Sequence, residues 1–456
     1  MQGATRWRAP PRTTMPDSLL LRILADSFLA GEPTVSQIVA RAGYALGKEW
    51  RWLRPLAERY TKMMDGRTRP RRRDVVEFLL HDAGFERARS KYSHQLRVEH
   101  RFAWPKQMQP VAVARDWDVP VIESAGALAE WLGVTPSDLL WFADLKGLAN
   151  DTSPSQLSHY HYRVLPKQYG SVRLIEAPKP RLKTLQQKVL AEILNKVPPH
   201  SAVHGFVKGR SIKTFVGPHV GRHIVLRMDL QDFFPSFAAA RLQAQFRTIG
   251  YPESVADLLG GICTNAVPSS FWRKPGLEVD SARLREAFIL YSKPHLPQGA
   301  PTSPALANVC TYRLDCRLTG FAKSVGAEYT RYADDLAFSG NHAFSRHVER
   351  FSTHVAALLI QEGFSVNFRK TRVMRQGVRQ HLAGVVVNRC ANVMRPDFDR
   401  LKATLTNCVR LGPQSQNRQA HPDFRAHLEG RVGFVEMVNP IKGKRLRAIF
   451  ENIRWE

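Results

Sequence analysis

Residues 329–339 read Tyr-Thr-Arg-Tyr-Ala-Asp-Asp-Leu-Ala-Phe-Ser, and they decide how the rest of the chain is interpreted. Apolar and aromatic residues flank two adjacent carboxylates, Asp334 and Asp335, which is typical of two β-strands joined by a short turn. Adjacent carboxylates repel each other, so a turn that presents both is costly unless water or cations neutralise them. Hard divalent cations such as Mg²⁺ prefer oxygen ligands of this kind. A solvated turn is the simpler alternative for an isolated Asp pair.

A third carboxylate follows another apolar run, residues 224–228, which predicts a strand that ends at Asp229. If this strand lies beside the hairpin, Asp229 meets Asp334 and Asp335. Three convergent carboxylates can hold two Mg²⁺ ions about 4 Å apart, the arrangement that polymerases and nucleases use. One ion would activate a primer 3′-hydroxyl and the other would hold a triphosphate, with Mn²⁺ as an alternative ion. The sequence therefore predicts a two-metal nucleotidyl-transfer site.

The composition favours a globular protein that binds a polyanion. The chain has 456 residues, of which 67 are Lys or Arg and 40 are Asp or Glu, giving a formal net charge of +27. Phosphate backbones bind such basic surfaces through counterion release, whereas an anionic membrane is the weaker alternative. No apolar run approaches the roughly 20 residues that span a bilayer. We expect a soluble, cytoplasmic protein without a membrane partner, and five cysteines without C-x-x-C spacing predict buried thiols instead of disulfides or zinc ligands.

Three boxes in one order resemble those of the bacterial reverse transcriptases, in particular the retron type. The first is Asp229 followed by Phe-Phe-Pro-Ser at 233–236, the second is Leu-Pro-Gln-Gly-Ala-Pro-Thr-Ser-Pro at 296–304, and the third is Tyr-Ala-Asp-Asp at 332–335. One Y-x-D-D box alone arises by chance in many chains, but three boxes in this order and spacing are specific. The likeness runs from about Gly126 to the C-terminal end. It implies an RNA-directed DNA polymerase.

The resemblance implies an α+β fold of the right-hand type, with a palm made of an antiparallel sheet and packed helices. We place the fingers at 121–220, the palm at 221–390 and a helical thumb at 391–456. Within the fingers, residues 161–165 and 171–175 read as a hairpin. An amphipathic helix pair begins near residue 124, and we expect five of its side chains to face inward: Leu128, Leu132, Leu139, Leu140 and Phe142.

Residues 1–120 lie outside the resemblance and are predicted to form a basic, mainly helical extension. Apolar residues recur at helical spacing from about 16 to 81. A basic cluster interrupts this spacing, and it is either a solvated charged face or a nucleic-acid contact: Arg67, Arg69, Arg71, Arg72 and Arg73.

The resemblance also implies roles for residues around the substrate. Asp229, Asp334 and Asp335 correspond to the metal-binding catalytic carboxylates, and Lys370 to a proton donor for the pyrophosphate leaving group, with an ordinary surface lysine as its alternative. The incoming dNTP would meet four residues: Phe234 as a steric gate against the ribose 2′-hydroxyl, Gln298 at the sugar, and Lys167 and Arg173 at the triphosphate. The nucleic acid would meet Arg210, the hairpin turn at Gly384, and the basic thumb residues Arg400 and Lys402.

The retron type further implies a biological role, which we state as a hypothesis. Such an enzyme would copy a structured noncoding RNA into multicopy single-stranded DNA and act with a separate effector protein in phage defence. Residues 215–219 and 382–384 depart from the N-A-x-x-H and V-T-G boxes of many retron enzymes, agreeing only at His219 and Gly384. A reverse transcriptase of another defence system is therefore the nearest alternative. An RNA-dependent RNA polymerase, against which Phe234 argues, and a non-catalytic RNA-binding scaffold, against which the intact carboxylates argue, are more distant ones.

Overall fold

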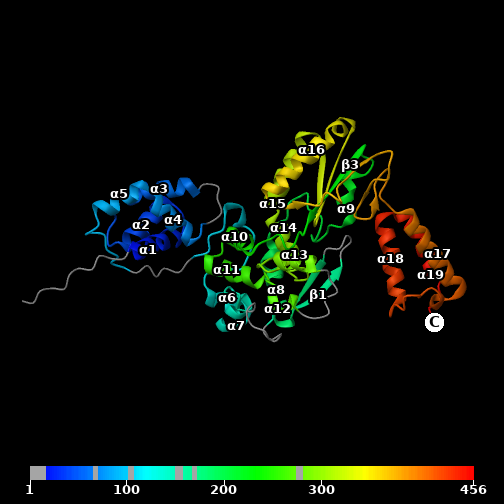
Figure 1. Ribbon diagram of the computed structural model, residues 1–456, viewed down its shortest axis with the longest axis horizontal. Helices are drawn as coiled ribbons and strands as arrows, with labels where there is room; N and C mark the ends of the chain where they lie inside the picture. The colour runs from blue at the N-terminus through cyan, green and yellow to red at the C-terminus, as the bar shows by residue number, and fades with distance from the viewer. Residues whose placement is uncertain are drawn as a thin grey trace, which may run out of the picture. The chain divides into compact units, whose positions relative to one another are not determined.

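The computed structural model describes residues 17–64, 70–100, 107–148, 158–166, 172–273 and 281–455. The chain forms two compact units, each assembled from segments that are far apart in the sequence (Figure 1). The first unit comprises Met1–His161, Pro178–Lys196 and Ala239–Pro294, and the second comprises Tyr162–Ala177, Val197–Ala238 and His295–Glu456.

The N-terminal part of the first unit is a cluster of five helices, drawn in blue in Figure 1. Their inward faces form one hydrophobic core that includes Leu24, Phe28 and Tyr60. The helical spacing predicted a helical unit from about residue 16 to 81, where the first four of these helices lie, and the fifth extends the cluster beyond residue 81. Their bounds are α1 (Asp17–Leu29), α2 (Val35–Ala45), α3 (Leu53–Met64), α4 (Arg72–His81) and α5 (Ala83–Lys91).

Two arginines of the basic cluster, Arg71 and Arg72, make contacts within the first unit. Arg71 is mostly buried, bonds to Gln243 and lies 3.6 Å from the carboxylate of Asp257. Arg72 pairs with Asp26, and its main-chain N–H donates to Glu253 at 2.9 Å. These contacts tie α4 to α1, α10 and α11, a packing role that neither alternative for the cluster anticipated. Arg67 and Arg69 lie outside the described residues.

Of the remaining helices of the first unit, α6, α7, α8 and α10 contact α11, and α12 and α13 contact each other. The helix pair near residue 124 is confirmed, with Ser124 and Thr135 as the N-caps. Four of its five expected inward residues are buried or nearly so, but Leu140 is 60% exposed, because the face of α7 that meets α11 carries its neighbours Leu139 and Phe142. The bounds are α6 (Ala125–Leu132), α7 (Pro136–Ala143), α8 (Pro180–Glu192), α10 (Ala239–Ile249), α11 (Glu253–Ile262), α12 (Ser269–Trp272) and α13 (Ser281–Tyr291).

An antiparallel sheet of five strands forms the centre of the second unit. Its order is β4-β5-β3-β6, and β7 also pairs with β3. The sequence predicted a strand that ends at Asp229, and pairing with β6 continues it two residues further, to Gln231. The bounds are β3 (Ile224–Gln231), β4 (Glu328–Tyr332), β5 (Asp335–Gly340), β6 (Ser365–Val366) and β7 (Arg372–Arg375).

Helices cover both faces of this sheet. Ile224, Val225 and Leu226 are consecutive and fully buried, and because successive residues of a strand point to opposite faces, neither face of β3 is open to water. The predicted hairpin is confirmed as the two-stranded sheet of β1 (Tyr160–Pro166) and β2 (Val172–Pro178). The helices of this part are α9 (Ile212–Val216), η5 (Gly217–His219), α14 (Ser303–Cys310), α15 (Tyr312–Ser324) and α16 (His342–Gln361).

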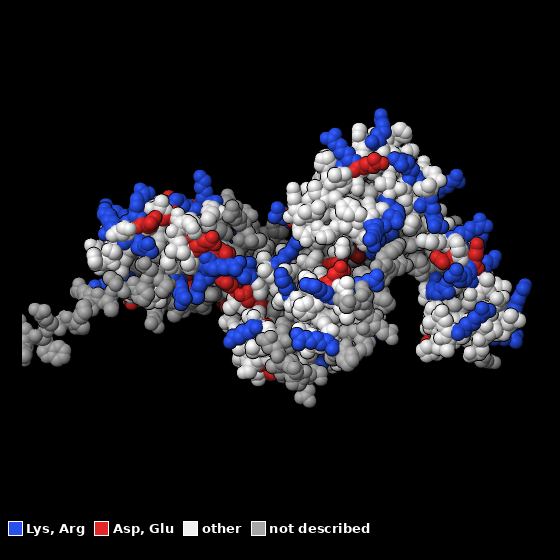
Figure 2. Space-filling model, viewed as in Figure 1, with Lys and Arg blue, Asp and Glu red and all other residues white. Residues whose placement is uncertain are grey.

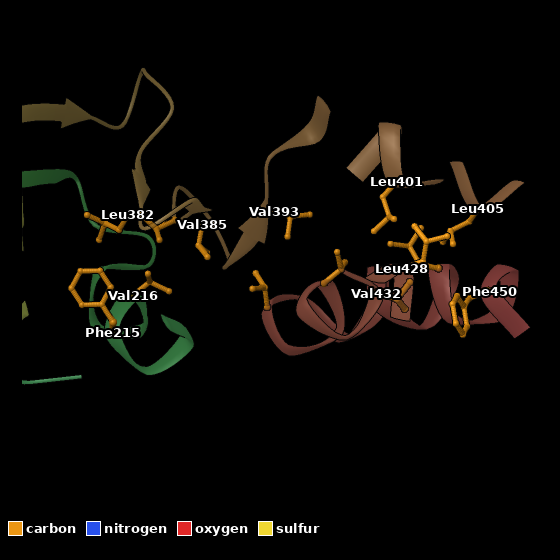
Figure 3. Close-up of a cluster of buried hydrophobic side chains, with 14 of the residues drawn as sticks. Phe215, Val216, Leu382, Val385, Val393, Leu401, Leu405, Leu428, Val432 and Phe450 are labelled. Atoms are coloured by element: carbon orange, nitrogen blue, oxygen red, sulfur yellow. The ribbon is translucent and has the colours of Figure 1, made fainter. Parts of the chain in front are cut away.

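Three C-terminal helices complete the second unit, following a small sheet of order β10-β9-β8. Figure 3 shows the hydrophobic cluster that links them, running from Phe215 and Val216 through the small sheet to Leu401, Leu428 and Phe450. This continuous core holds the helices to the base of the five-stranded sheet. The bounds are β8 (His381–Leu382), β9 (Val385–Val386), β10 (Asn392–Val393), α17 (Arg395–Leu411), α18 (Phe424–Val438) and α19 (Pro440–Glu451).

Two further expectations concern the whole chain. All five cysteines are free, but Cys316 and Cys390 are exposed, so the expectation of buried thiols holds only for Cys263, Cys310 and Cys408. Within the described ranges, no helix has the length and apolar character needed to cross a bilayer.

Candidate active site

The three carboxylates named from the sequence come together on neighbouring strands. Asp229 in β3 lies directly opposite Asp335, the first residue of β5. Asp334 is in the turn between β4 and β5, and its carbonyl accepts a hydrogen bond of 2.9 Å from Leu230. The sheet register therefore brings one acid from β3 beside the adjacent pair on the hairpin.

The turn that carries Asp334 is tight and closely packed from outside. Ala333 has φ +55°, in the left-handed region that side-chain-bearing residues rarely adopt. Gly205, from another loop, lies so close that a Cβ at its position would stand 2.6 Å from the amide nitrogen of Ala333. A side chain at position 205 would thus push against the main chain of the turn, which explains glycine here.

Two cations already neutralise part of the negative charge. Lys370 Nζ lies 3.0 and 3.1 Å from the two carboxylate oxygens of Asp229. Arg227 donates twice to Oδ1 of Asp335, from Nε at 2.9 Å and from Nη2 at 2.7 Å. Burial, together with the charges of Asp335 and Asp229, raises the pKa of Asp334 to about 6. Burial also raises the pKa of Asp335, although Arg227 opposes this shift.

The donor set fits a hard divalent ion. In the described parts of the chain, no three His, Cys, Asp or Glu side chains stand arranged as a ready metal-binding group. Lys370 and Arg227 bind two of the three carboxylates instead. Carboxylate oxygens are nevertheless the ligands that Mg²⁺ prefers, and a bound cation would oppose the effect of burial and of the neighbouring negative charges, which raise the pKa of Asp334. Asp229, Asp334 and Asp335 are the residues that would hold such an ion.

The residues assigned to the incoming nucleotide lie on separate elements. Phe234 is partly buried, with its ring centroid 6.2 Å from that of Phe206. The carbonyl of Gln298 accepts a 2.8 Å hydrogen bond from the amide of Glu176 in β2. Arg173 is exposed on the same strand, and Lys167 lies outside the described residues.

The loop around Gln298 has a buried support that the sequence did not indicate. Gly299 has φ +133°, and a Cβ there would lie 2.9 Å from the carbonyl oxygen of Glu176. The carboxylate of Glu176 is 3.0 Å from Nε2 of His295, and both side chains are almost fully buried. Ser303 Oγ donates to the carbonyl of Pro297 at 2.7 Å. Strand β2 therefore holds this loop through main chain and side chain together.

The residues assigned to the nucleic acid differ in whether their side chains already bind other parts of the protein. Arg210 donates to the main-chain carbonyls of His200, Ser201 and Val203, so its guanidinium holds a loop. Gly384, at φ +81°, belongs to the two-residue turn between β8 and β9. Arg400 and Lys402 are exposed on α17, and Figure 2 shows Lys and Arg side chains across the visible face of the C-terminal helices.

Sequence reasoning missed the most buried charges of the second unit. Arg331 in β4 and Asp315 in α15 form an ion pair of 2.8 Å, and neither side chain has any exposed surface. Asp315 also accepts a 2.8 Å hydrogen bond from the hydroxyl of Tyr329. The available signal was an arginine between the tyrosines of a predicted strand, because a charge is almost never fully buried unless it is paired.

His219 links the two strands of the hairpin from behind. Its Nδ1 is 2.7 Å from the hydroxyl of Ser339 in β5, and its Nε2 is 2.7 Å from the hydroxyl of Thr330 in β4. Burial lowers the pKa of His219 to about 3. The histidine is therefore neutral, with one ring nitrogen donating and the other accepting.

Comparison with known proteins places this site in a family. Residues 165–395 match the family described as "Reverse transcriptase (RNA-dependent DNA polymerase)", which implies a right-hand polymerase fold and agrees with the helices and antiparallel sheets seen here. The chain is 39% identical to the retron Mx65 reverse transcriptase of Myxococcus xanthus over 363 residues, 79% of this chain and 78% of that relative.

Two other relatives carry the same kind of name. The identity is 37% to the retron Mx162 reverse transcriptase of Myxococcus xanthus, over 72% of this chain and 66% of the relative. It is 29% to the retron Ec86 reverse transcriptase of Escherichia coli, over 60% and 74%. The chain belongs to the bacterial retron-type reverse transcriptases and is an RNA-directed DNA polymerase.

Proposed function

We propose that Asp229, Asp334 and Asp335 bind two Mg²⁺ ions and catalyse the joining of dNTPs to a primer 3′-hydroxyl on an RNA template. The observation that carries this proposal is the register of β3 and β5, which sets Asp229 opposite Asp335 beside the turn at Asp334. Reverse transcriptases generally use divalent metals. The ions would supply an activated hydroxyl and charge neutralisation at the triphosphate.

The surrounding side chains bind and orient the nucleotide. Lys370 Nζ lies 3.0 Å from Asp229 at the edge of the carboxylate cluster, and its ammonium group gives a proton to the departing pyrophosphate. Phe234 blocks a ribose 2′-hydroxyl, and Gln298 contacts the sugar from a loop that β2 fixes. Arg173 and Lys167 bind the triphosphate through charge-assisted hydrogen bonds.

The template–primer duplex lies along the C-terminal helices. The domain assignment of fingers at 121–220, palm at 221–390 and thumb at 391–456 follows the family and remains a prediction. Exposed Arg400 and Lys402 on α17 suit contacts to phosphates, which position a duplex without reading its sequence. The turn at Gly384 approaches the primer end, and Arg210 shapes a loop beside the template.

The product is multicopy single-stranded DNA copied from a structured noncoding RNA, in a system that defends a bacterium against phage through a separate effector. Support comes from the relatives, whose names identify them as retron reverse transcriptases. A reverse transcriptase of another defence system remains the alternative, since residues 215–219 and 382–384 depart from two retron boxes.

Primer extension tests the chemistry. The purified protein should extend a primer on an RNA template with dNTPs in Mg²⁺, lose all extension in EDTA, and regain it when excess Mg²⁺ is added. NTPs should be poor substrates because of Phe234. Extension that continues in the chelator would contradict the assignment of divalent metal ions to the three carboxylates. Extension that proceeds equally with NTPs would contradict the role of Phe234 as a steric gate.

Sequencing the nucleic acid that copurifies with the protein tests the product. The retron interpretation predicts one structured RNA joined through a 2′-hydroxyl to a short complementary DNA. Unrelated RNAs without attached DNA would favour the alternative. A plaque assay with the complete gene neighbourhood, compared with the same neighbourhood carrying Asp334→Asn, tests the defence role.

A further inference from the structure

A buried arginine lies directly beneath the turn that carries Asp334 and Asp335. Arg331 is the last residue but one of β4, and its side chain has no exposed surface. Removing a guanidinium from water is strongly unfavourable unless it is paired and hydrogen-bonded. The protein accepts this cost at a position only two residues before the strained residue of the turn, Ala333.

Every side of this guanidinium has a partner. Nε and Nη2 each donate to one oxygen of Asp315 at 2.8 Å. Nη2 also donates to the hydroxyl of Thr311 at 2.6 Å, and Nη1 to Oδ1 of Asn308 at 3.2 Å. The remaining bond, 3.1 Å from Nη1, goes to the main-chain carbonyl of Ala333. Arg331 therefore joins the turn to the end of α14 and to the start of α15.

These partners connect the box at residues 332–335 with the box at residues 296–304, which is separate from it in the sequence. Asn308 is on α14, the helix that begins at the end of the box containing Gln298. Its Nδ2 donates to the carbonyl of Gly205 at 2.9 Å, and Gly205 is the residue packed against the amide of Ala333. Arg331 and Asn308 thus fix the turn from inside, while Gly205 closes it from outside.

The turn needs such support because two effects oppose its shape. Ala333 adopts a left-handed conformation, which is unfavourable for a residue with a side chain, and the carboxylates of Asp334, Asp335 and Asp229 are like charges held close together. A strained, charged turn persists only where the surrounding structure over-determines it. An arginine presents five N–H donors in a fixed planar fork, whereas a lysine has three donors on a single nitrogen and cannot reach acceptors spread around such a plane.

We propose that Arg331 is a positioning residue for nucleotidyl transfer. By holding the Ala333 carbonyl against α14 and α15, it fixes the direction in which Asp334 and Asp335 present their carboxylates beside Asp229. Arg331 itself touches no substrate. The inference rests on the proposed catalytic role of these carboxylates, and it adds that their geometry depends on the buried Arg331–Asp315 pair.

Arg331→Lys in the full-length protein tests the proposal, because it keeps the charge and removes the fork. Rapid mixing of dNTP with a preformed complex of protein, primer and RNA template separates the burst rate constant from the burst amplitude, the fraction of competent molecules. We expect the rate constant to fall by about tenfold or more, since small misplacements of reacting groups can cost about 100-fold. The amplitude per folded molecule and the dNTP concentration for half-maximal rate should change less than about twofold.

The opposite pattern would overturn the proposal. If Arg331 only stabilises the fold, the amplitude falls and the molecules that remain competent react at the wild-type rate. Tyr329→Phe is a gentler second variant, because it removes only the hydroxyl that donates to Asp315 and leaves the ring stacked on Phe338. A lower rate constant at full amplitude in this variant supports positioning through Asp315, and a wild-type rate constant argues against it.

Arg41→Lys provides a matched control. Arg41 is 2% exposed in the first unit, and it donates to the carbonyls of Ser27 at 2.7 Å and Glu32 at 3.0 Å. Its replacement should lower the melting temperature without changing the burst rate constant. An equal loss of rate constant in Arg41→Lys would make the effect of Arg331→Lys a general consequence of destabilisation and would refute the proposal.

The same assay separates this inference from the proposed function. If Asp334→Asn reacts at the wild-type rate, the assignment of the carboxylates fails. If Asp334→Asn is inactive while Arg331→Lys reacts at the wild-type rate, the carboxylates stand and only the positioning role fails.

Discussion

The five-stranded sheet and the C-terminal helices belong to one unit and share one hydrophobic core, yet they use charged residues in opposite ways. Around the carboxylates of the sheet, cations are paired with acids, as in Arg227 with Asp335, Arg331 with Asp315 and Lys370 with Asp229. On α17, Arg400 and Lys402 are exposed to water. Lys and Arg near the carboxylates therefore hold other side chains in fixed positions, whereas the exposed Lys and Arg of α17 attract negative charge in general.

The difference lies in how strongly water screens the charges. Beneath the turn, low polarity strengthens each electrostatic contact and penalises each unpaired group, so the loss of one partner is felt at once. On an exposed helix, each charge interacts weakly and is screened by salt, and affinity is the sum of many such terms. We therefore expect substitutions near the sheet to act individually and strongly, and substitutions on α17 to act incrementally and with salt dependence.

The largest effect on the sheet side is expected at Lys370. Lys370→Met should lower the rate of single-nucleotide incorporation by about 100-fold or more, the usual contribution of a positioned general acid. Lys370→Arg keeps the positive charge beside Asp229 but cannot release a proton at neutral pH. If Lys370→Arg restores the rate, the residue neutralises Asp229 and is not the proton donor.

Phe234 should change selectivity more than rate. Phe234→Ala opens space for a ribose 2′-hydroxyl, so the preference for dNTP over NTP, measured as a ratio of kcat/KM values, should fall on the order of tenfold or more. The matched control is Phe368→Ala, because Phe368 is 69% exposed. An unchanged ratio in Phe234→Ala would show that another group excludes ribonucleotides.

His219 makes the stability of the sheet sensitive to acid. Its pKa is about 3 in the folded protein and about 6.5 when unfolded, so the unfolded state binds the extra proton first and stability falls as pH drops from 6.5 towards 3. At pH 5 this residue should cost about 2 kcal/mol of unfolding free energy. His219→Asn should be less stable at neutral pH but show a shallower decline between pH 6.5 and 4 in denaturant titrations. An equal slope would assign the acid sensitivity elsewhere.

The smallest individual effects should come from α17. Arg400→Ala and Lys402→Ala should each weaken binding of a primer–RNA duplex a few-fold and reduce the slope of log affinity against log salt by about one unit for each lost phosphate contact. Filter binding at several salt concentrations measures both. Arg350→Ala on α16, an exposed cation away from the proposed duplex path, is the control; an identical change there would remove the special role of α17.

Local patterns predicted those elements whose formation depends on nearby residues. Apolar spacing found the helices near residue 124, and turn residues found the hairpin of β1 and β2. The predicted end of β3 at Asp229 was two residues short, because the pairing of β3 with β6 is non-local and carries the strand to Gln231. Leu140 was placed inside for a similar reason: the position of α11, and not the spacing within α7, decides which face is buried.

For the site, the sequence predicted which carboxylates matter but not what holds them. Strand adjacency was enough to bring Asp229 to Asp334 and Asp335. The partners Arg227, Asp315 and Glu176 were missed, because hydrogen bonds between side chains on different elements leave no periodic signal. Arg331 was missed as well, although an arginine between two tyrosines of a predicted strand is a signal that could have indicated a buried ion pair.

Replacing both hairpin carboxylates is the most direct test of the claim that Asp229, Asp334 and Asp335 together perform nucleotidyl transfer. Single-turnover incorporation by Asp334→Asn/Asp335→Asn should be undetectable, while binding of the RNA template stays within about twofold of wild type, because the exposed basic residues are untouched. Asp116→Asn, at an exposed aspartate outside the site, should react normally. Incorporation at the wild-type rate by the double variant would contradict the account.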